Sequence, residues 1–420
     1  MRNNPFLVLT IFSIILITID AYSWWGLTKI IHDFSTKIKR IITVAFWIVP
    51  VLIIGGMIFV FSMRSQIDPA HFMSYFYYIS GPLILFYVPK LVFVIFNIFD
   101  DIIFSVRKFV FHKVKKSVHN QDVKNITRRK FLNQAGIVFA GVPFISLAYG
   151  ITSGRFNFTV RKINLNFPNW PKKLNGFKIV QISDFHMGSF FNQIDIIKET
   201  VDLINQQQAD LLLFTGDFVN NVSGELEPFV KTLQNLQAGT GIYSVLGNHD
   251  YGDYVRWNSE SDKQKNLERL IQLQKEIGFD LLLNESRKIE LDGEKIELIG
   301  VENWGLPPFP QYGDLNKALK NTEKETFKIL MSHDPTHFSA QVQDKTDIDL
   351  TLSGHTHGAQ FGIEIPGWRW SPVSLRYKHW GGLYNEGSQK IYVNTGIGFI
   401  GFPGRVGMPP EITVFELNNA

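Results

Sequence analysis

Three long apolar runs dominate the first quarter of the chain. They extend from Phe6 to Leu27, from Ile41 to Met63 and from Met73 to Phe99. About 20 consecutive apolar residues are enough for a helix to cross the hydrocarbon core of a bilayer. One such run is compatible with a buried helix of a soluble domain, but three in succession are typical of a membrane protein. The pattern therefore predicts three transmembrane helices within residues 1–105.

Two charged residues interrupt these runs, Asp20 in the first and Lys90 in the third. A charged side chain is costly inside a bilayer unless it reaches the interface or finds a partner. We therefore expect Asp20 to lie near a helix end. We expect Lys90 either to extend its amine to the interface or to mark a helix boundary.

A fourth apolar run, from Phe131 to Ile151, follows a densely basic segment. Residues Thr127 to Leu132 read TRRKFL and match the S/T-R-R-x-F-L part of a twin-arginine export signal, with Asn133 in place of the final Lys. A plain membrane anchor flanked by positive charges is the alternative interpretation. Under both interpretations, residues 106–154 form a basic cytoplasmic segment followed by a fourth apolar helix.

The charges are distributed unevenly along the chain. Residues 1–130 hold 16 Lys and Arg against 6 Asp and Glu, whereas residues 131–420 hold 26 against 32. The basic part is also the apolar part, which indicates a membrane surface and not a nucleic acid as its partner. Basic loops stay in the cytoplasm, so segments 28–40 and 106–130 are predicted inside and the N-terminus outside. Residues 155–420 then lie outside the cytoplasm if the fourth run crosses the membrane, and inside if it does not.

From Phe177 onward the pattern changes to short buried strands that alternate with helical segments. The runs FKIVQIS, ADLLLFTGD and GIYSVLGNHD are of strand type, and IDIIKETVDLINQQQ between the first two has helical spacing. Further strands are predicted at FKILMSHDP and IDLTLSGHTHG. Alternation of this kind is typical of a layered α/β fold with a central sheet. The chain contains no Cys, which excludes disulfides, thiolate metal sites and a Cys nucleophile.

Five of the predicted strands end in polar groups of the same kind. A single His or Asp at a strand end has most often an ordinary structural role, but groups at five strand ends gather at one edge of an α/β sheet. They offer nitrogen and oxygen without sulfur, which suits Mn, Fe or Zn. A buried cluster of this composition needs cations to compensate it. The candidate residues are Asp184, His186, Asp217, Asn248, His249, His333, His355 and His357.

The order of these motifs, DFH, GD, GNHD, a lone His and GHTH, resembles the calcineurin-like metallophosphoesterases. The resemblance covers about residues 155–420 and implies a four-layer α-β-β-α sandwich, preceded here by transmembrane helices. The C-terminal stretch GFPGRVGMPPEITVFEL, together with GHTHGAQ, resembles a membrane-anchored bacterial branch whose members often carry an N-terminal anchor or a twin-arginine signal.

The resemblance also implies roles by position. The first metal is assigned to Asp184, His186 and His357, the second to Asn248, His333 and His355, and Asp217 bridges both. His249 is expected beside the substrate phosphate as a catalytic residue. Asp250 follows it directly and is grouped with it, chiefly as an orienting residue, with a direct catalytic role as the weaker alternative. Arg405 lies in a Gly-rich loop, where it either binds the substrate phosphate or is an ordinary surface residue.

The implied activity is hydrolysis of a phosphate ester or pyrophosphate bond by a hydroxide that bridges two divalent ions. Four apolar runs exceed what tethering requires, so a phosphorylated lipid is a candidate substrate, and the twin-arginine translocase is a candidate partner. The expected location is the inner (cytoplasmic) membrane, as a multi-pass protein with an extracytoplasmic catalytic domain. Two alternatives remain: a UDP-diacylglucosamine-type pyrophosphatase with a cytoplasmic active site, and a metal-binding membrane scaffold without hydrolysis.

Overall fold

The chain folds into two compact units. The computed structural model describes residues 5–63, 66–67, 69–110, 128–191 and 193–420. The membrane unit contains Met1–Ile67 and Tyr75–Tyr149, and the catalytic unit contains Asp68–Ser74 and Gly150–Ala420.

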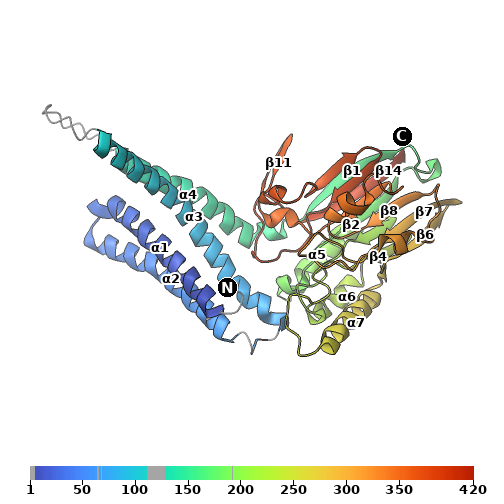
Figure 1. Cartoon of the computed structure of the whole chain (residues 1–420), viewed down its shortest axis with the longest axis horizontal. Coiled ribbons are helices and arrows are strands. Elements are labelled where there is room, and N and C mark those ends of the chain that lie inside the picture. The colour runs from blue at the N-terminus through green and yellow to red at the C-terminus, as the bar shows by residue number, and fades with distance from the viewer. Residues whose placement is uncertain (1–4, 64–65, 68, 111–127, 192) are drawn as a thin grey trace. The chain divides into compact units, whose positions relative to one another are not determined.

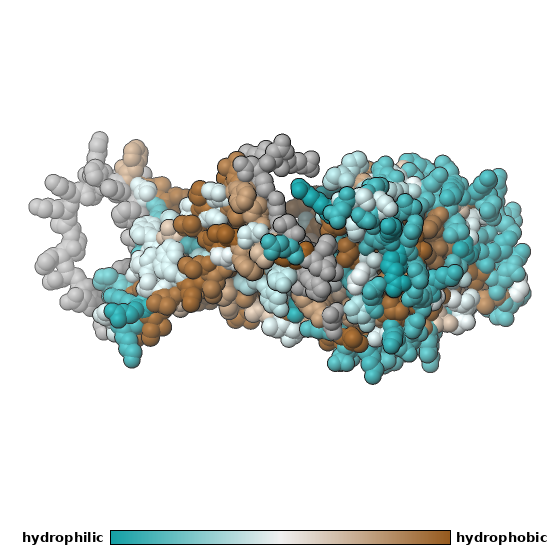
Figure 2. Space-filling view, turned by 90° about the horizontal axis from the view of Figure 1, so that it is seen from below, coloured by the Kyte–Doolittle hydropathy of each residue, from teal (hydrophilic) through white to brown (hydrophobic). Residues whose placement is uncertain are grey.

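Four long helices form the membrane unit: α1 (Pro5–Ile30), α2 (Thr36–Met63), α3 (Pro69–Val110) and α4 (Arg128–Thr152). Each contains a stretch long and apolar enough to cross a membrane, and the fourth of these spans is Gln134–Thr152. Many of their large apolar side chains are exposed, and apolar side chains colour much of this unit brown in Figure 2. The three predicted spans and the fourth apolar helix are thus confirmed. The basic residues 111–127 lie outside the described part of the chain.

Asp20 and Lys90 do not lie where we expected them. Asp20 is fully buried and sits well inside α1, where its Oδ1 accepts a hydrogen bond of 2.6 Å from Lys90 Nζ. Tyr87 Oη donates to the other carboxylate oxygen, also at 2.6 Å. The expectations of a helix end for Asp20 and of an interface or a helix boundary for Lys90 were wrong. The two charges satisfy each other between α1 and α3, because an intramembrane charge needs a partner where water is absent.

Two mixed six-stranded sheets form the centre of the catalytic unit. The first has the order β1-β14-β2-β3-β4-β5 and the second the order β12-β13-β9-β8-β7-β6. Strands β2, β3 and β4 run parallel to one another, as do β7, β8 and β9. The first sheet contains β1 (Thr159–Phe167), β14 (Glu411–Asn419), β2 (Phe177–Ile182), β3 (Leu211–Phe214), β4 (Gly241–Ser244) and β5 (Asp280–Leu281). The second contains β12 (Gly382–Glu386), β13 (Gln389–Val393), β9 (Leu350–Ser353), β8 (Phe327–Met331), β7 (Glu294–Gly300) and β6 (Glu285–Leu291).

The buried side chains form three layers of contact, which define a four-layer sandwich (Figure 1). Residues such as Ile179 of β2 and Ile329 of β8 pack between the two sheets. Helices α5 (Ile194–Asn205), α6 (Val230–Leu233) and α7 (Glu260–Ile277) cover the outer face of the first sheet. Helix α8 (Leu315–Leu319) and residues 338–342 cover that of the second. The predicted α-β-β-α architecture is confirmed.

Local sequence explains where the long helix of this unit begins and ends. Helix α7 begins after Ser259, whose Oγ accepts a 3.1 Å hydrogen bond from the backbone N–H of Asp262. It ends at Gly278, which adopts a left-handed φ of 113° that a side chain would disfavour. Its apolar residues Leu270, Leu273 and Ile277 recur at helical spacing and face the first sheet.

Candidate metal centre

The predicted site residues lie in loops that follow parallel strands of both sheets. Those from the first sheet follow β2, β3 and β4, and those from the second sheet follow β8 and β9. Backbone hydrogen bonds join these loops to one another: the N–H of Asp184 donates to Gly216, and the N–H of Gly354 donates to His333. The carboxyl ends of the two sets of strands therefore meet, and they bring together residues that are far apart in the sequence.

Two groups of buried His and Asp side chains result from this arrangement. The first consists of Asp184, His186 and His357, and the second of Asp217, His333 and His355. Within each group the potential ligand atoms lie within 4.8 Å of one another. These two clusters are consistent with a dinuclear metal site.

The distances in the first group fit a shared cation. His186 Nε2 lies 3.0 Å from His357 Nε2, and His357 Nε2 lies 3.3 Å from Asp184 Oδ1. Two imidazole nitrogens that point at each other in a buried place need either a proton or a metal ion between them. Nitrogen and carboxylate donors at such separations suit a first-row divalent metal.

Asp217 stands between the two groups. Its Oδ2 lies 3.1 Å from His333 Nε2 in the second group and 3.6 Å from His186 Nε2 in the first. Its other oxygen, Oδ1, accepts a 2.8 Å hydrogen bond from the backbone N–H of His249. A carboxylate with this position fits the bridging role that the resemblance implies.

Two further donors are oriented by their neighbours. His333 Nδ1 lies 2.7 Å from the carbonyl of Thr215, an arrangement that places the proton on Nδ1 and leaves Nε2 as the ligand atom. Asn248 donates from Nδ2 to Tyr254 Oη at 2.8 Å. Its Oδ1 is buried and has no hydrogen-bond partner within the described part of the chain, so this oxygen is available to a cation.

The backbone is strained at these positions. Asp184, His186, Asp217, His355 and His357 all have φ between 50° and 73°, in the left-handed region that non-Gly residues seldom occupy. Five such residues among the seven predicted ligands form a concentration typical of functional sites, where the surrounding fold holds strained residues in place.

Gly247, which directly precedes the candidate ligand Asn248, permits two of the ligand-bearing loops to approach each other closely. A Cβ added to Gly247 would collide with the backbone nitrogen and the side chain of Asp217. The loop that carries Asn248 can thus reach the loop that carries Asp217 only if this position has no side chain.

Burial and charge shift the pKa values of the cluster in different directions. Burial lowers the pKa of His186 to about 3 and that of His355 to about 4, which keeps both imidazoles neutral. Burial also raises the pKa of Asp184 to about 6. At His333 burial is opposed and overcome by the Asp217 and Asp184 carboxylates, which raise its pKa to about 10. Neutral imidazoles are the form that binds metal, so a metal ion that binds His333 has to displace the proton that the two carboxylates otherwise hold there.

His249 and Asp250 have different surroundings. His249 is half-buried, and its Nδ1 lies 2.6 Å from the carbonyl of Asn220, which leaves Nε2 for a ligand. Asp250 is fully buried, and its carboxylate accepts hydrogen bonds of 2.9, 2.9 and 2.8 Å from the backbone N–H groups of Asp217, Gly247 and Phe218. This placement favours the orienting role of Asp250 over a direct catalytic one.

Arg405 fits neither of its two predicted roles. It is 1% exposed, so the surface interpretation was wrong. Its guanidinium donates to the carbonyls of Gly398, Thr395 and Met408, and Nη2 lies 3.2 Å from His357 Nδ1. A buried guanidinium held by these acceptors lies behind a candidate ligand, and this placement does not fit direct binding of a substrate phosphate.

Two residues that the sequence did not single out contact His355. Its Nε2 lies 3.0 Å from Tyr377 Oη and 3.4 Å from Asp334 Oδ2. The Asp334 carboxylate accepts, and the Tyr377 hydroxyl can also accept, so a proton on Nε2 of His355 satisfies both and leaves Nδ1 to face a metal ion. Asp334 is 1% exposed and directly follows His333 in the motif SHDP, so its position next to a predicted ligand could have indicated a role at the site. The sequence around Tyr377 contains no motif that would have indicated such a role.

We expect the substitution Asp334→Asn to weaken metal binding about 10- to 100-fold, because the partner that orients His355 loses its charge. Isothermal titration of the metal-stripped protein with Mn²⁺ measures this effect. Asp347→Asn is the matched control, because Asp347 pairs with Lys328 and is 53% exposed. Equal affinity of the Asp334 variant and the control would show that Asp334 does not support the site.

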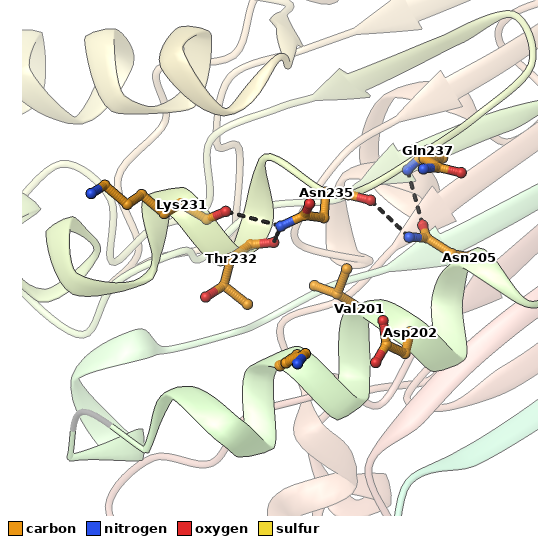
Figure 3. Close-up of a pocket in the computed structure, with 8 residues that line it drawn as sticks. Val201, Asp202, Asn205, Lys231, Thr232, Asn235 and Gln237 are labelled. Atoms are coloured by element: carbon orange, nitrogen blue, oxygen red, sulfur yellow. Dashed lines mark hydrogen bonds between the residues drawn. The ribbon is translucent and has the colours of Figure 1, made fainter.

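A pocket in the catalytic unit lies between α5 and α6 and is lined by Lys198, Val201, Asp202, Asn205, Lys231, Thr232, Asn235 and Gln237 (Figure 3). Asn205 Nδ2 donates to the carbonyl of Asn235, and Asn205 Oδ1 accepts from the backbone N–H of Gln237. These bonds tie the end of α5 to the segment after α6. None of the candidate metal ligands lines this pocket, and its polar contacts serve the fold.

Comparison with known proteins identifies both parts of the chain. A family described as "Probable Calcineurin-like phosphoesterase, transmembrane domain" matches residues 2–155, and "Calcineurin-like phosphoesterase" matches residues 177–359. The first match assigns the TRRKFL stretch to a transmembrane domain, so the twin-arginine interpretation gains no support. Thr127 itself lies outside the described residues.

Three relatives illustrate the extent of the similarity. "Uncharacterized metallophosphoesterase YkuE" of Bacillus subtilis is 31% identical over 71% of this chain and 99% of its own length. An "Uncharacterized metallophosphoesterase" of Helicobacter pylori is 30% identical over 57% of this chain and 59% of its own length. "Transmembrane protein with metallophosphoesterase domain" of Danio rerio is 27% identical over 66% and 62%, so the chain spans under two thirds of these last two relatives.

Among solved structures, the phosphopantetheinyl hydrolase PptH of Mycobacterium tuberculosis matches 48% of this chain and 89% of its own, with 12% identity and a TM-score of 0.28. The family matches, the relative from Bacillus subtilis and the two His/Asp clusters agree with one another. The chain therefore belongs to the calcineurin-like metallophosphoesterase family, as a hydrolase with an N-terminal domain of four membrane-spanning helices.

Proposed function

We propose that this protein hydrolyses a phosphate ester or pyrophosphate bond at a dimetal centre held by the two His/Asp clusters. The position of Asp217 between the clusters is the observation that supports this most strongly. Two bound divalent ions supply a water molecule of lowered pKa and positive charge against the phosphoryl oxygens. Asp184, His186 and His357 hold the first ion, and Asn248, His333 and His355 hold the second, with Asp217 shared. The metals are Mn, Fe or Zn.

His249 acts on the substrate in this proposal. Its Nδ1 is fixed by the carbonyl of Asn220, and its ring packs edge-on against His186 with centroids 5.0 Å apart. The remaining nitrogen, Nε2, can donate a proton to a phosphoryl oxygen or to the leaving group. Asp250 and Arg405 act indirectly, because the first holds the backbone of Asp217 and the second lies behind His357.

The membrane domain provides evidence for the side of the membrane on which the catalytic domain lies and for the class of its substrate. We propose that residues 1–105, 106–154 and 155–420 form the three parts of the protein, and that the catalytic domain lies on the extracytoplasmic side. The even number of spans and the basic segments 28–40 and 106–130 support this orientation. Four spans also support a phosphorylated lipid as substrate. Export by the twin-arginine route stays a prediction from the sequence alone.

Hydrolysis of p-nitrophenyl phosphate and bis-p-nitrophenyl phosphate tests the activity. We expect the full chain to lose activity when EDTA removes its metals and to regain it when Mn²⁺ is added. Protein that is fully loaded with metal but inert on monoesters, diesters, pyrophosphates and lipid phosphates would instead be a non-catalytic metal-binding scaffold.

An alkaline-phosphatase fusion at residue 160 tests the orientation. We expect an active fusion, because the catalytic domain then lies outside the cytoplasm. An inactive fusion that is stably produced would place the domain in the cytoplasm and would favour a nucleotide-linked lipid, such as UDP-diacylglucosamine, as the substrate class.

A further inference from the structure

A small hairpin that belongs to neither large sheet turns its apolar side to solvent. Strands β10 (Ile363–Ile365) and β11 (Trp368–Trp370) pair antiparallel and form a separate two-stranded sheet. Figure 1 shows β11 standing out from the two large sheets of the catalytic unit. The apolar hairpin face consists of Ile363, Ile365, Trp368 and Trp370, which are 50%, 54%, 51% and 40% exposed.

The strand register places these four side chains on one face. Ile363 pairs with Trp370, and Ile365 pairs with Trp368. Side chains two residues apart on a strand point the same way, and directly paired residues share a face. Glu364 and Arg369 form the pair between them and therefore lie on the opposite face.

The polar face, and not the apolar one, is held by the body of the catalytic unit. Arg161 of β1 donates to both oxygens of Glu364, at 2.8 and 2.6 Å, and its Nε lies 3.2 Å from the buried Glu411. Arg369 lies 3.7 Å from Glu364, and its guanidinium stacks 5.0 Å from the Trp380 ring centroid. Because these contacts fix the polar side inward, the apolar side is presented outward, which is the reverse of an ordinary surface hairpin.

Hydrogen bonds within the catalytic unit connect the base of this hairpin to Gly150, the residue at which the main segment of that unit begins. The backbone N–H of Arg405 donates to the carbonyl of Gly150 at 3.2 Å, and Gly150 lies within the span Gln134–Thr152. The next residue, Val406, bonds to Gln360 and Gly362 directly before β10 begins. The hairpin is thus held close to the point where the chain leaves the fourth span.

We propose that the apolar hairpin face inserts into the interfacial region of the bilayer that the four helices span. Trp side chains favour that region, where an apolar ring and a polar N–H are both accommodated. The four helices already hold the catalytic domain at the membrane, so insertion of the apolar hairpin face does not have to offset the entropy lost when a free protein binds a bilayer. The four side chains of this face are therefore enough to orient the domain. Five residues separate His357 from Ile363, so docking of this face brings the metal-binding loop toward the lipid surface.

The absence of Cys from the chain allows a direct test with single labelled positions. The full chain carrying Ile365→Cys is labelled with the environment-sensitive fluorophore NBD and placed in phosphatidylcholine–phosphatidylglycerol nanodiscs with a quencher on the upper acyl chain. The variant Glu290→Cys is the control, because this β6 side chain is 62% exposed on a polar hairpin. Trp368→Cys is a second probe from the paired strand.

We expect both hairpin probes to emit at shorter wavelength and to be quenched at least about twofold more than the Glu290→Cys control. Quenching of both hairpin probes equal to that of the control would overturn the proposal. Efficient disulfide cross-linking between Ile365→Cys side chains of two chains, without lipid quenching, would also overturn it and would assign the face to a second copy. Neither probe position touches the metal ligands, so the result does not depend on the proposed hydrolysis.

Discussion

Replacement of Asp217 by Asn is expected to abolish phosphoesterase activity, with a fall of about three orders of magnitude in kcat/KM. Asp217 Oδ2 lies near both His333 and His186, so loss of its charge weakens both metal positions together. The backbone contact can survive, because an amide oxygen can still accept the 2.8 Å hydrogen bond from the N–H of His249. Measurement of kcat/KM with Mn²⁺, together with metal content by mass spectrometry, records both effects.

Asp210→Asn is the matched control for this substitution. Asp210 directly precedes β3, the strand that Asp217 follows, and its Oδ2 accepts a 2.7 Å hydrogen bond from the backbone N–H of Lys178. The control is expected to keep its activity and its metal. An Asp217→Asn variant that retains full activity, while it remains folded, would show that this carboxylate does not bridge two ions.

Replacement of Lys90 by Met is expected to destabilise the membrane domain by about 3–5 kcal/mol, because it leaves the buried Asp20 carboxylate without its cation. Asp20 is fully buried, and Tyr87 Oη of α3 then remains as a hydrogen-bond donor to its carboxylate. Thermal unfolding of the full chain in detergent, with the circular dichroism of the helices as the signal, measures the loss. The variant is expected to be less stable because the Asp20 carboxylate stays buried while the Lys90 ammonium that compensates its charge is gone.

The double variant Asp20→Asn with Lys90→Met separates this effect from simple loss of packing. We expect it to recover much of the stability that Lys90→Met loses, because the uncompensated charge is gone. Lys37→Met, at an exposed position near the start of α2, is expected to change the stability little. Equal losses in the single and double variants would mean that the ion pair does not stabilise the fold.

The architecture could be predicted because its signals are local. Each membrane span lies in one long apolar run, and strands β2, β3, β4, β8 and β9 of the catalytic domain each end shortly before a motif that carries candidate ligands, such as GNHD or GHTH. In parallel strands of one sheet the carboxyl ends share an edge, so the positions of Asp184 and Asp217 after β2 and β3 already implied that these two residues converge. Asp184 and His357 follow strands of different sheets, and only the family resemblance implied that they meet. What the motifs could not show is which atom of each imidazole faces a metal, since this depends on neighbours such as Thr215 and Tyr377.

The residues that were misplaced are those whose partners are distant in the sequence. Asp20 and Lys90 are 70 residues apart, and the sequence around either residue does not indicate that the other is its partner. Arg405 is a different case, because it lies in a Gly-rich loop that suggests exposure, yet carbonyls only 3 to 10 residues away bind its guanidinium and it is buried. Trp368 and Trp370 could have packed locally, and only the strand register and the Arg161–Glu364 pair show that they face outward.

The most direct test of the central claim is a titration of the metal-stripped full chain with Mn²⁺, followed by calorimetry and by hydrolysis of p-nitrophenyl and bis-p-nitrophenyl phosphate in parallel samples. The arrangement of the two clusters around Asp217 predicts that two ions bind per chain and that hydrolysis rises as the second site fills. Binding of a single ion with full activity, or activity that persists after the metal has been removed, would contradict a dimetal mechanism.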